Sequence, residues 1–231
     1  MSTEIFNFFE ESIRIPYPAN KNLYFFFKRI FDVFFAFTGI LFLLPFFLLI
    51  SILVKLDSKG PVFYKQVRVG RNFRKFFILK FRTMNSIGGA GSDPITCRGD
   101  ARITKIGKFL RRYKLDELPQ LLNVLKGEMS LVGPRPEIPK FVSDNIIFET
   151  VLKIKPGITD FASINFFNEE EILHDAKLDR PDINDFYTRF ILPSKLKLNL
   201  KYMDNMSIFL DVSLIIKTLF CIKNKNLIPK N

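Results

Sequence analysis

An uncharged apolar block at residues 33–54 constrains this chain more than any other stretch of its sequence. As a helix it is long enough to cross a bilayer core, for which about 20 apolar residues suffice. The block is apolar on every side and not along one stripe, which argues against a buried helix of a soluble protein. The sequence therefore predicts a membrane segment near the start of the chain.

Two features leave open how this block meets the membrane. Pro45 lies near its middle, where it removes a helical hydrogen bond and bends the axis. Cations flank both ends, with Lys28 and Arg29 before the block and Lys55 and Lys59 after it, whereas a spanning helix has a cationic bias toward the cytoplasmic side. A re-entrant segment that enters and leaves by one leaflet fits this symmetry. A kinked transmembrane helix fits as well, because proline is tolerated in spanning helices.

The charge balance indicates a polyanionic partner. Lys and Arg outnumber Asp and Glu by 35 to 23, which gives a formal net charge of +12. Such a balance suits nucleic acid, acidic lipid headgroups or phosphate-bearing substrates. The chain has one histidine and two cysteines, at no metal-ligand spacing, which leaves no zinc site and no histidine-activated nucleophile.

A β-hairpin is predicted directly after the apolar block. Residues 62–69 and 76–81 are rich in aromatic and β-branched side chains and are separated by a turn sequence. Lys80 and Arg82 belong to a group of cations that makes this region basic. A solvated strand face explains any one of these charges equally well.

The rest of the chain predicts one helix-rich domain. Residues 102–112 form a basic amphipathic helix, and residues 208–219 form a last helix with its apolar side chains on one face. Between them, residues 164–195 are polar, acid-rich and poorly periodic. The sequence contains no internal repeat and no low-complexity linker that would divide the domain.

Two adjacent carboxylates, Asp116 and Glu117, lie between basic segments. Pro119 follows them and predicts a helix that starts near Leu118, with both acids at its N-terminal edge. Free backbone N–H groups and the positive end of the helix dipole meet there and attract anions. Two ionised carboxylates in this position can hold a divalent cation, which can neutralise a phosphate. They can equally do no more than cap the helix.

An arginine between two prolines, Arg135, is the other candidate for anion binding. The prolines fix the backbone, so the arginine can be aimed with little loss of entropy on binding. Arginine suits bidentate contacts to phosphate. A rigid loop with an incidental arginine is the competing interpretation.

Five motifs follow one another along the chain: Lys-Phe-Arg-Thr-Met at 80–84, Leu-Asp-Glu-Leu-Pro-Gln-Leu at 115–121, Asn-Val-Leu-Lys-Gly-Glu-Met-Ser at 123–130, Val-Gly-Pro-Arg-Pro at 132–136 and Lys-Pro-Gly-Ile-Thr at 155–159. Together with the proline-broken apolar block, this set resembles the bacterial sugar transferase family, the monotopic polyprenyl-phosphate phosphoglycosyl transferases, in its short form. The resemblance is close over residues 28–159 and loose in the C-terminal region.

This resemblance implies a helix-rich α+β fold in three parts. An N-terminal arm at 1–29 precedes a re-entrant, helix-break-helix membrane segment at 30–56. A cytoplasmic phosphoglycosyl transferase domain with a small β-hairpin follows at 57–231. The protein would lie in the bacterial inner membrane, at its cytoplasmic face, in contact with inner-membrane lipid.

The resemblance also implies an activity. Such enzymes transfer a sugar-1-phosphate from a UDP-sugar to undecaprenyl phosphate, release UMP and start an O-antigen, capsule or other surface glycan. Asp116 would be the nucleophile that forms a covalent phosphosugar intermediate, and Asp116 and Glu117 would hold Mg2+. The substrate phosphates would be bound by a set of cations: Lys80, Arg82, Arg111 and Arg135. Because phosphoryl transfer depends on positioning and charge neutralisation, this set of residues suits it.

Three positions depart from the family pattern. Many members have Gly where Asp160 stands and Gln where Ser163 stands, which affects contacts in that loop. The residue before the break proline is usually small and polar, whereas here it is Leu44.

One alternative of another class is a membrane-anchored basic protein that binds acidic lipid or nucleic acid without catalysis. It does not account for Asp116 and Glu117 between the basic segments, because these carboxylates would repel the same ligand. We therefore expect no nucleic-acid partner. The single apolar block argues against a polytopic enzyme. The sequence identifies neither the sugar nor the glycan, and it leaves the oligomeric state open, a homodimer included.

Overall fold

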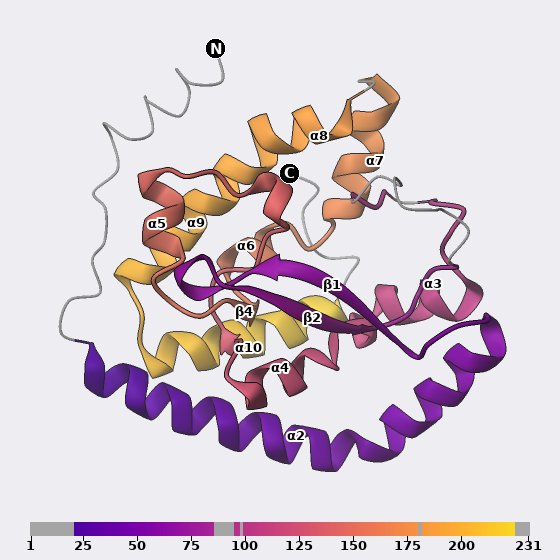
Figure 1. Ribbon diagram of the computed structural model, residues 1–231, viewed down its shortest axis with the longest axis horizontal. Coiled ribbons are helices and arrows are strands. Elements are labelled where there is room, and N and C mark those ends of the chain that lie inside the picture. The colour runs from indigo at the N-terminus through magenta and orange to yellow at the C-terminus, as the bar shows by residue number, and fades with distance from the viewer. Residues whose placement is uncertain (1–20, 86–94, 98, 180–181, 225–231) are drawn as a thin grey trace.

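A computed structural model describes residues 21–85, 95–97, 99–179 and 182–224 (Figure 1). Most of the predicted N-terminal arm lies outside these residues. The α-helices are α2 (Asn22–Asp57), α3 (Lys105–Arg112), α4 (Gln120–Lys126), α5 (Ile146–Val151), α6 (Phe161–Asn165), α7 (Glu169–Asp179), α8 (Ile183–Phe186), α9 (Leu192–Asp204) and α10 (Ile208–Lys223). The strands are β1 (Phe63–Val69), β2 (Lys75–Phe81), β3 (Ser130–Val132) and β4 (Gly157–Thr159). Short 3-10 turns are η1 (Arg71–Phe73), η2 (Leu115–Glu117) and η3 (Pro139–Phe141), and a π-helical turn, η4 (Tyr187–Ile191), joins α8 to α9. These elements confirm a helix-rich fold with a small hairpin.

Two small sheets carry the loops that bear the motifs. β1 and β2 form the predicted antiparallel hairpin, with Phe63 opposite Phe81. β3 and β4 pair in parallel and meet at two glycines whose backbones are in close contact. A Cβ on Gly157 would lie 2.1 Å from the Gly133 nitrogen, and one on Gly133 would lie 2.6 Å from the Lys155 oxygen. Only glycine fits at these two positions, which explains a glycine in each of these two motifs.

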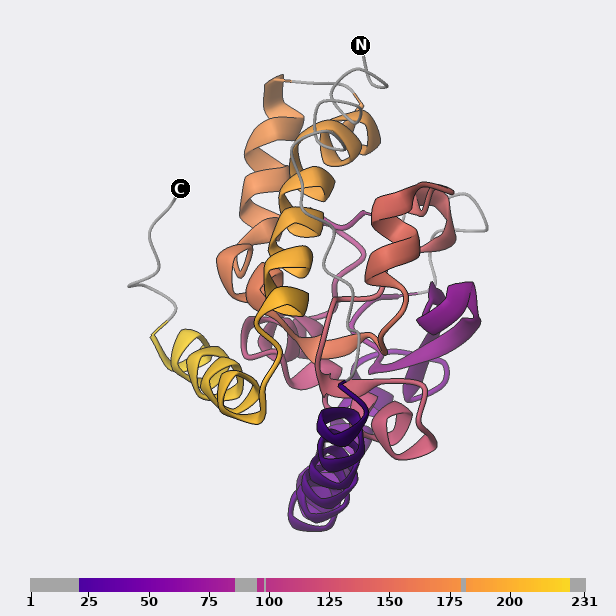
Figure 2. The same ribbon diagram turned by 90° about the vertical axis from the view of Figure 1, so that its left-hand side faces the viewer.

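The segment at 164–195, predicted to be poorly periodic, is largely helical. It forms the end of α6, then α7, α8, η4 and the start of α9. α9 buries one face, including Leu196 and Leu200, in the main hydrophobic core with α5 and Val132 at the end of β3. The polar first turn of α7 and the π-helical turn η4 interrupt a regular apolar stripe, because each changes the spacing of the buried positions. α7, α8 and α9 cover the sheets on the side opposite α2 (Figures 1 and 2).

The apolar block forms one continuous helix, α2, which extends through Pro45. The expected division into two helices by a break is therefore wrong at the level of local structure. α2 also begins at Asn22, within the segment assigned to the N-terminal arm. A proline removes one hydrogen bond and displaces one carbonyl but leaves the rest of the ladder intact. α2 accordingly bends around the underside of the domain without interruption (Figure 1).

The N-terminal half of α2 is attached to the domain by buried polar contacts. Lys28 Nζ lies 2.7 Å from Asp211 Oδ2 of α10. The Arg29 guanidinium donates to the Val124 and Leu125 carbonyls at the end of α4, at 2.7 and 3.0 Å. Lys28 and Arg29 therefore hold the helix against the domain, although their sequence position suggested cations that flank a membrane segment.

Asp32 makes a third attachment in this half of α2. Its carboxylate accepts from the Ser130 hydroxyl at 2.7 Å and from the Leu131 N–H at 3.0 Å. Asp32 is 2% exposed, so β3 fixes the position of α2 through a buried carboxylate.

The C-terminal half of α2 contacts the same domain. Phe47 packs against Phe81 of β2, with their ring centroids 5.3 Å apart. Arg82 donates to the Val54 carbonyl at 3.1 Å and the Ser58 carbonyl at 2.6 Å, and Asp57 accepts from the Ile106 N–H of α3 at 3.0 Å. Both halves of α2 therefore lie on one domain.

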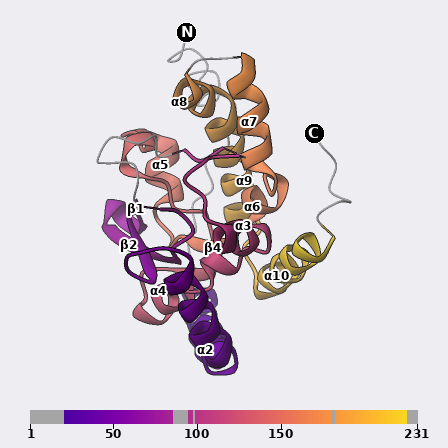
Figure 3. The same cartoon turned by 90° about the vertical axis from the view of Figure 1, so that its right-hand side faces the viewer.

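A broad apolar surface remains uncovered on α2 and α10. α2 is the one helix among the described residues that is long and apolar enough to cross a membrane, with a mean hydropathy of 2.7 over its most apolar window. The outer face of α10 exposes Phe209, Ile216 and Phe220. Figures 2 and 3 show α10 and α4 on opposite sides of α2.

Candidate active site

The acidic pair lies in a short turn that the sequence predicted as a helix start. Lys114 has a left-handed backbone, with φ of 55°, and turns the chain into η2, which contains Asp116 and Glu117. Pro119 is the N-cap of α4, which begins at Gln120 and not near Leu118. The pair therefore precedes α4, and the turn aims the two carboxylates into the domain.

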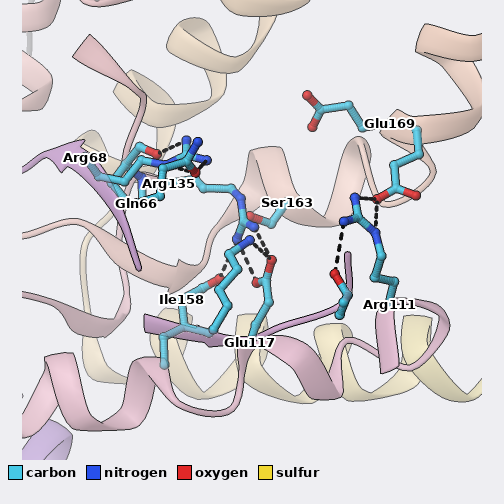
Figure 4. A network of polar contacts seen from close by, with 12 residues as sticks. Gln66, Arg68, Arg111, Glu117, Arg135, Ile158, Ser163 and Glu169 are labelled. Atoms are coloured by element: carbon cyan, nitrogen blue, oxygen red, sulfur yellow. Dashed lines mark hydrogen bonds and ion pairs between the residues drawn. The ribbon is translucent and has the colours of Figure 1, made fainter. Parts of the chain in front are cut away.

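Glu117 is held between two of the predicted phosphate-binding cations. Lys80 Nζ of β2 donates to Glu117 Oε1 at 2.9 Å. The Arg135 guanidinium donates to both Glu117 oxygens, with Nη1 3.0 Å from Oε2 (Figure 4). This bidentate pairing is the geometry that favours arginine over lysine. The structure thus brings Lys80, Glu117 and Arg135 together from three separate motifs.

The charges of these three groups stabilise one another. Burial acts to raise the pKa of Glu117, but Arg135 and Lys80 hold it well below its ordinary value of 4.5. Burial acts to lower the pKa of Arg135, and Glu117 raises it. Burial lowers the pKa of Lys80 despite the opposing effect of Glu117. Glu117 is therefore an anion at neutral pH, fixed in place by its two partners.

Asp116 has a different environment from its neighbour. It is 6% exposed, and its Oδ1 atom is buried without a hydrogen-bond partner. Burial, and then the charge of Glu117, raise the pKa of Asp116 above its ordinary value of 3.8, while Lys80 and Arg111 act to lower it. A buried oxygen without a partner is free to react or to bind an electrophile or cation.

Arg111 and Arg82, the other two predicted cations, have partners elsewhere. Arg111 Nη2 lies 2.5 Å from Glu170 Oε1 of α7, and its Nη1 donates to the Thr83 hydroxyl at 3.3 Å. Figure 4 shows the Arg111 network separate from the Glu117–Arg135 pair. Arg82 binds the carbonyls at the end of α2, and its Nε and Nη1 atoms are buried without a partner.

A single cavity of about 1200 Å3 connects these groups. Its polar wall holds both acids and all four predicted cations: Lys80, Arg82, Arg111, Asp116, Glu117 and Arg135. The cavity also extends along α2 and α10, where its lining is apolar. Every candidate site residue predicted from the sequence therefore faces one space.

Two of the three departures from the family pattern, Asp160 and Ser163, lie in the part of the site that holds Arg135. Asp160 is fully buried and accepts from the Arg135 N–H at 3.1 Å and from the Ser163 N–H at 2.6 Å. Burial raises the pKa of Asp160 above its ordinary value of 3.8. Ser163 lines the cavity, and its hydroxyl is buried without a partner. Asp160 therefore fixes the arginine loop, and Ser163 offers the cavity an uncommitted hydroxyl.

Sequence reasoning missed a second polar cluster in the cavity wall. Lys195 Nζ lies 2.8 Å from Glu169 Oε1 and 3.1 Å from the Tyr187 hydroxyl, which donates to Glu137 at 2.8 Å. All four residues line the cavity. They come from segments that carry none of the five motifs, apart from Glu137, which directly follows one. The only signal for this cluster is that Lys195 is buried on α9. Its burial could not be recognised from the sequence, because it depends on knowing which face of the helix packs against the domain.

The residues around Asp116 fit a magnesium ion. Mg2+ is bound by one or two carboxylates together with substrate phosphates and water. Asp116 supplies a buried oxygen without a partner, and Glu117 is adjacent, although both of its oxygens already accept from cations. No cluster of three acidic, histidine or cysteine ligands occurs among the described residues, so such an ion would depend on the substrate for further ligands.

This geometry defines a class of protein: a helix-rich domain with a long apolar helix docked along it, and an acidic pair among cations in an open cavity. Comparison with known proteins agrees with that class. The sequence profile described as bacterial sugar transferase matches residues 23–225. The chain therefore belongs to the bacterial sugar transferase family.

Three relatives illustrate the range of this similarity. An undecaprenyl-phosphate glucose phosphotransferase of Komagataeibacter xylinus is 37% identical over 200 residues, which cover 83% of this chain and 35% of that protein. A UDP-N-acetylgalactosamine-undecaprenyl-phosphate N-acetylgalactosaminephosphotransferase of Aeromonas hydrophila is 37% identical over 85% of this chain and 44% of its own length. The exopolysaccharide production protein PSS of Rhizobium leguminosarum bv. phaseoli is 35% identical, over 83% of this chain and 92% of its own. The chain thus spans less than half of the first two relatives and nearly all of the third.

Proposed function

We propose that this protein transfers a sugar-1-phosphate from a UDP-sugar to undecaprenyl phosphate, through a covalent intermediate on Asp116, in the first membrane step of a surface glycan. One observation carries the proposal: Asp116 presents a buried oxygen without a partner to a cavity whose lining includes all four predicted phosphate-binding cations. The relatives named for phosphotransfer to undecaprenyl phosphate support it.

In the first step, an Asp116 oxygen attacks the phosphorus that bears the sugar. A bond forms between this oxygen and phosphorus, the bond from phosphorus to the bridging oxygen of the diphosphate breaks, and UMP leaves with that oxygen. In the second step, a phosphate oxygen of undecaprenyl phosphate attacks the same phosphorus and releases the Asp116 carboxylate. Covalent catalysis of this kind divides one difficult transfer into two easier steps.

The surrounding charges lower the barrier to attack by an anion on an anion. A carboxylate approaching a diphosphate is repelled unless cations neutralise the phosphate oxygens. Arg135 and Lys80 lie at Glu117, directly beside Asp116, and Arg111 faces the same cavity. We propose that all three bind substrate phosphates, with Arg82 at the edge of the site. Glu117 orients Arg135 and Lys80 before substrate binds.

We propose that Asp116 and Glu117 hold Mg2+, as their chemistry allows. The ion would neutralise phosphate charge when bound. A requirement for Mg2+ would also distinguish the enzyme from a protein that only binds acidic lipid, because such a protein needs no divalent cation. Release of UMP should stop when the protein is treated with EDTA and resume when Mg2+ is restored.

The test of the covalent step uses the purified protein with a panel of UDP-sugars and no acceptor. One equivalent of UMP should appear, and the intact mass should increase by one phosphosugar, located by peptide mapping at Asp116. Asp116→Asn keeps the side-chain shape, removes the nucleophilic anion and should reduce both signals to background. An adduct at a different residue would refute the assignment.

We propose that α2 is re-entrant and holds the domain at the cytoplasmic face of the inner membrane. The attachments of both halves of α2 to the same domain support this, since a helix cannot cross a bilayer while both of its halves contact one domain on one side. Buried contacts at Asp32 in the first half and at Val54 in the second are the clearest of these attachments. The bend at Pro45 keeps both halves within reach of the domain.

Cysteine labelling in intact cells tests this topology. With Cys97 and Cys221 replaced, a single cysteine introduced at Ser2 should remain unlabelled by an impermeant maleimide until the inner membrane is permeabilised. Labelling from outside in intact cells would show that the helix crosses the membrane.

A further inference from the structure

The large cavity has two chemically different parts. One part is the polar wall around Asp116 described above. The other is an apolar groove between two helices, to which α2 contributes Phe31, Phe35 and Gly39. α10 contributes Val212, Ile215, Ile216, Leu219 and Ile222. On each helix these residues recur three or four positions apart along most of the contributing stretch, so each set lies along one face.

The two parts form one continuous space. Leu118 and Leu121 line it directly after the acidic pair, and Leu131 and Ile158 line it on β3 and β4. These side chains lead from Asp116 into the groove without a charged residue among them. A ligand that occupies both parts must therefore have an anionic end and a long apolar chain.

The geometry of α10 keeps the groove fixed. At one end Asp211 binds Lys28 of α2. Further along, Thr218 and Thr159 of β4 share a hydrogen bond of 2.6 Å. These contacts fix the position of α10 relative to α2 and β4, so the groove between the two helices is part of the folded structure.

The groove is also open on the apolar side of the molecule. Ile216 and Leu219 line it and are nevertheless 60% and 62% exposed. The faces of α2 and α10 next to the opening expose further large apolar side chains, among them Phe34 and Phe220. An apolar chain that enters here leaves a lipid environment for an apolar lining and does not have to cross water.

We propose that this groove binds the first isoprene units of the polyprenyl acceptor, with the acceptor phosphate at Asp116. The proposal rests on the proposed function, since it assigns the lipid substrate of that reaction to one part of the site. The donor then uses the polar part of the cavity, toward Lys195 and Glu169. Both substrates converge on Asp116 in turn, as a covalent intermediate requires.

Adjacent residues on each helix supply matched controls. Leu219 lines the groove and Phe220 does not, yet their exposures are 62% and 60%. On α2, Phe35 lines the groove and Phe34 does not. Changing either member of a pair to Asn removes an exposed apolar side chain from the same helix, so both changes weaken membrane contact to a similar extent.

The experiment measures two half-reactions for the four Asn variants in lipid nanodiscs. We expect Leu219→Asn and Phe35→Asn to raise KM for undecaprenyl phosphate about tenfold, from the loss of one large apolar contact. Phe220→Asn and Phe34→Asn should change it less than about twofold. The donor-only burst of UMP should be unchanged in all four. With dimethylallyl phosphate, whose single isoprene unit leaves most of the groove empty, all four variants should match the wild type.

Photolabelling gives a readout that does not depend on turnover. A polyprenyl phosphate with a diazirine in its phosphate-proximal isoprene units should label the residues that line the groove, which are Phe31, Phe35 and Gly39 on α2 and Val212, Ile215, Ile216, Leu219 and Ile222 on α10. Labels confined to Phe34, Phe209 and Phe220, or equal KM changes within each matched pair, would overturn the proposal. Occupation of the groove by a second copy of the chain would also overturn it, and would appear as protein crosslinks there. If the wild type gave no donor-only burst, the proposed function would fail, while the photolabelling would still decide the groove.

Discussion

The buried ion pair between α2 and α10 allows a quantitative test of how the apolar helix is held. Lys28 Nζ and Asp211 Oδ2 are 2.7 Å apart, with side chains 9% and 0% exposed. The Tyr24 and Tyr202 hydroxyls also donate to Asp211, at 3.0 and 2.7 Å. Asp211 therefore accepts three bonds at a site closed to water, and its charge is balanced by one buried ammonium group.

Removing one charge from this pair should destabilise the protein far more than removing both. Asp211→Asn leaves the Lys28 ammonium buried beside an amide, a loss of about 3–5 kcal/mol. Lys28→Met leaves Asp211 with two tyrosine donors, so we expect a smaller loss of about 1–3 kcal/mol. The double variant leaves neither member of this pair charged, and its Asn can still bond both hydroxyls, so it should lie within about 1 kcal/mol of the wild type.

Thermal unfolding of the detergent-solubilised protein measures these differences. At about 2–4 °C per kcal/mol for a chain of this size, Asp211→Asn should lower Tm by about 6–20 °C. The double variant should recover most of that loss. A loss below about 1 kcal/mol in Asp211→Asn, or losses that simply add in the double variant, would refute the argument that an uncompensated buried charge dominates.

Three further changes test other parts of the structure. Arg135→Lys keeps the charge but loses the bidentate contact with Glu117. The barrier to single-turnover UMP release should rise by about 1–3 kcal/mol, which slows the rate about 5- to 150-fold. An unchanged rate would mean that the guanidinium is not needed. The folded protein raises the pKa of Asp160, so the stability of the wild type should decline as pH rises from about 4 and the buried carboxyl must ionise. Asp160→Asn cannot ionise, so its Tm should improve relative to the wild type over the same pH range; parallel Tm–pH curves would contradict this. Pro45→Ala restores a helical hydrogen bond and lets α2 straighten, so some molecules with a cysteine at Ser2 should become labelled from outside the cell; no change would show that the docking contacts alone hold the bend.

Local pattern was sufficient to predict several elements. The hairpin, the basic helix α3 and the last helix α10 were predicted from the spacing of apolar residues and from turn residues. Both signals depend only on residues a few positions apart in the sequence. The ordered set of motifs assigned Lys80, Glu117 and Arg135 to one site, and the structure joins them by hydrogen bonds. The roles of Asp116 and of the magnesium ion remain predictions.

Other features depend on tertiary contacts that no local pattern records. Lys28 and Arg29 look like cations that mark a membrane boundary, yet their partners are 183 and 95 residues away, at Asp211 and Val124. Arg82 has the sequence context of a phosphate-binding residue, but it donates to the carbonyls at the end of α2. In each case a cation has several plausible partners, and only the packing of α2 decides between them.

Tertiary contacts also explain why α2 continues through Pro45 without a break. A proline at mid-helix is compatible with a break or a bend, and the choice depends on whether other contacts hold both halves. Phe47 and Ile50, just beyond it, are buried against the domain. These contacts preserve α2 as one helix.

The exposed length of α2 has a kinetic consequence. A helix of this kind rises about 1.5 Å per residue, so α2, which covers Asn22–Asp57, is longer than the bilayer core of about 30 Å is thick. In the re-entrant topology proposed above, α2 would lie along one leaflet, and an acceptor in that leaflet would meet it by diffusion in two dimensions. The rate should then follow the mole fraction of acceptor among the lipids: adding inert phospholipid at constant bulk acceptor should slow turnover, as in surface dilution.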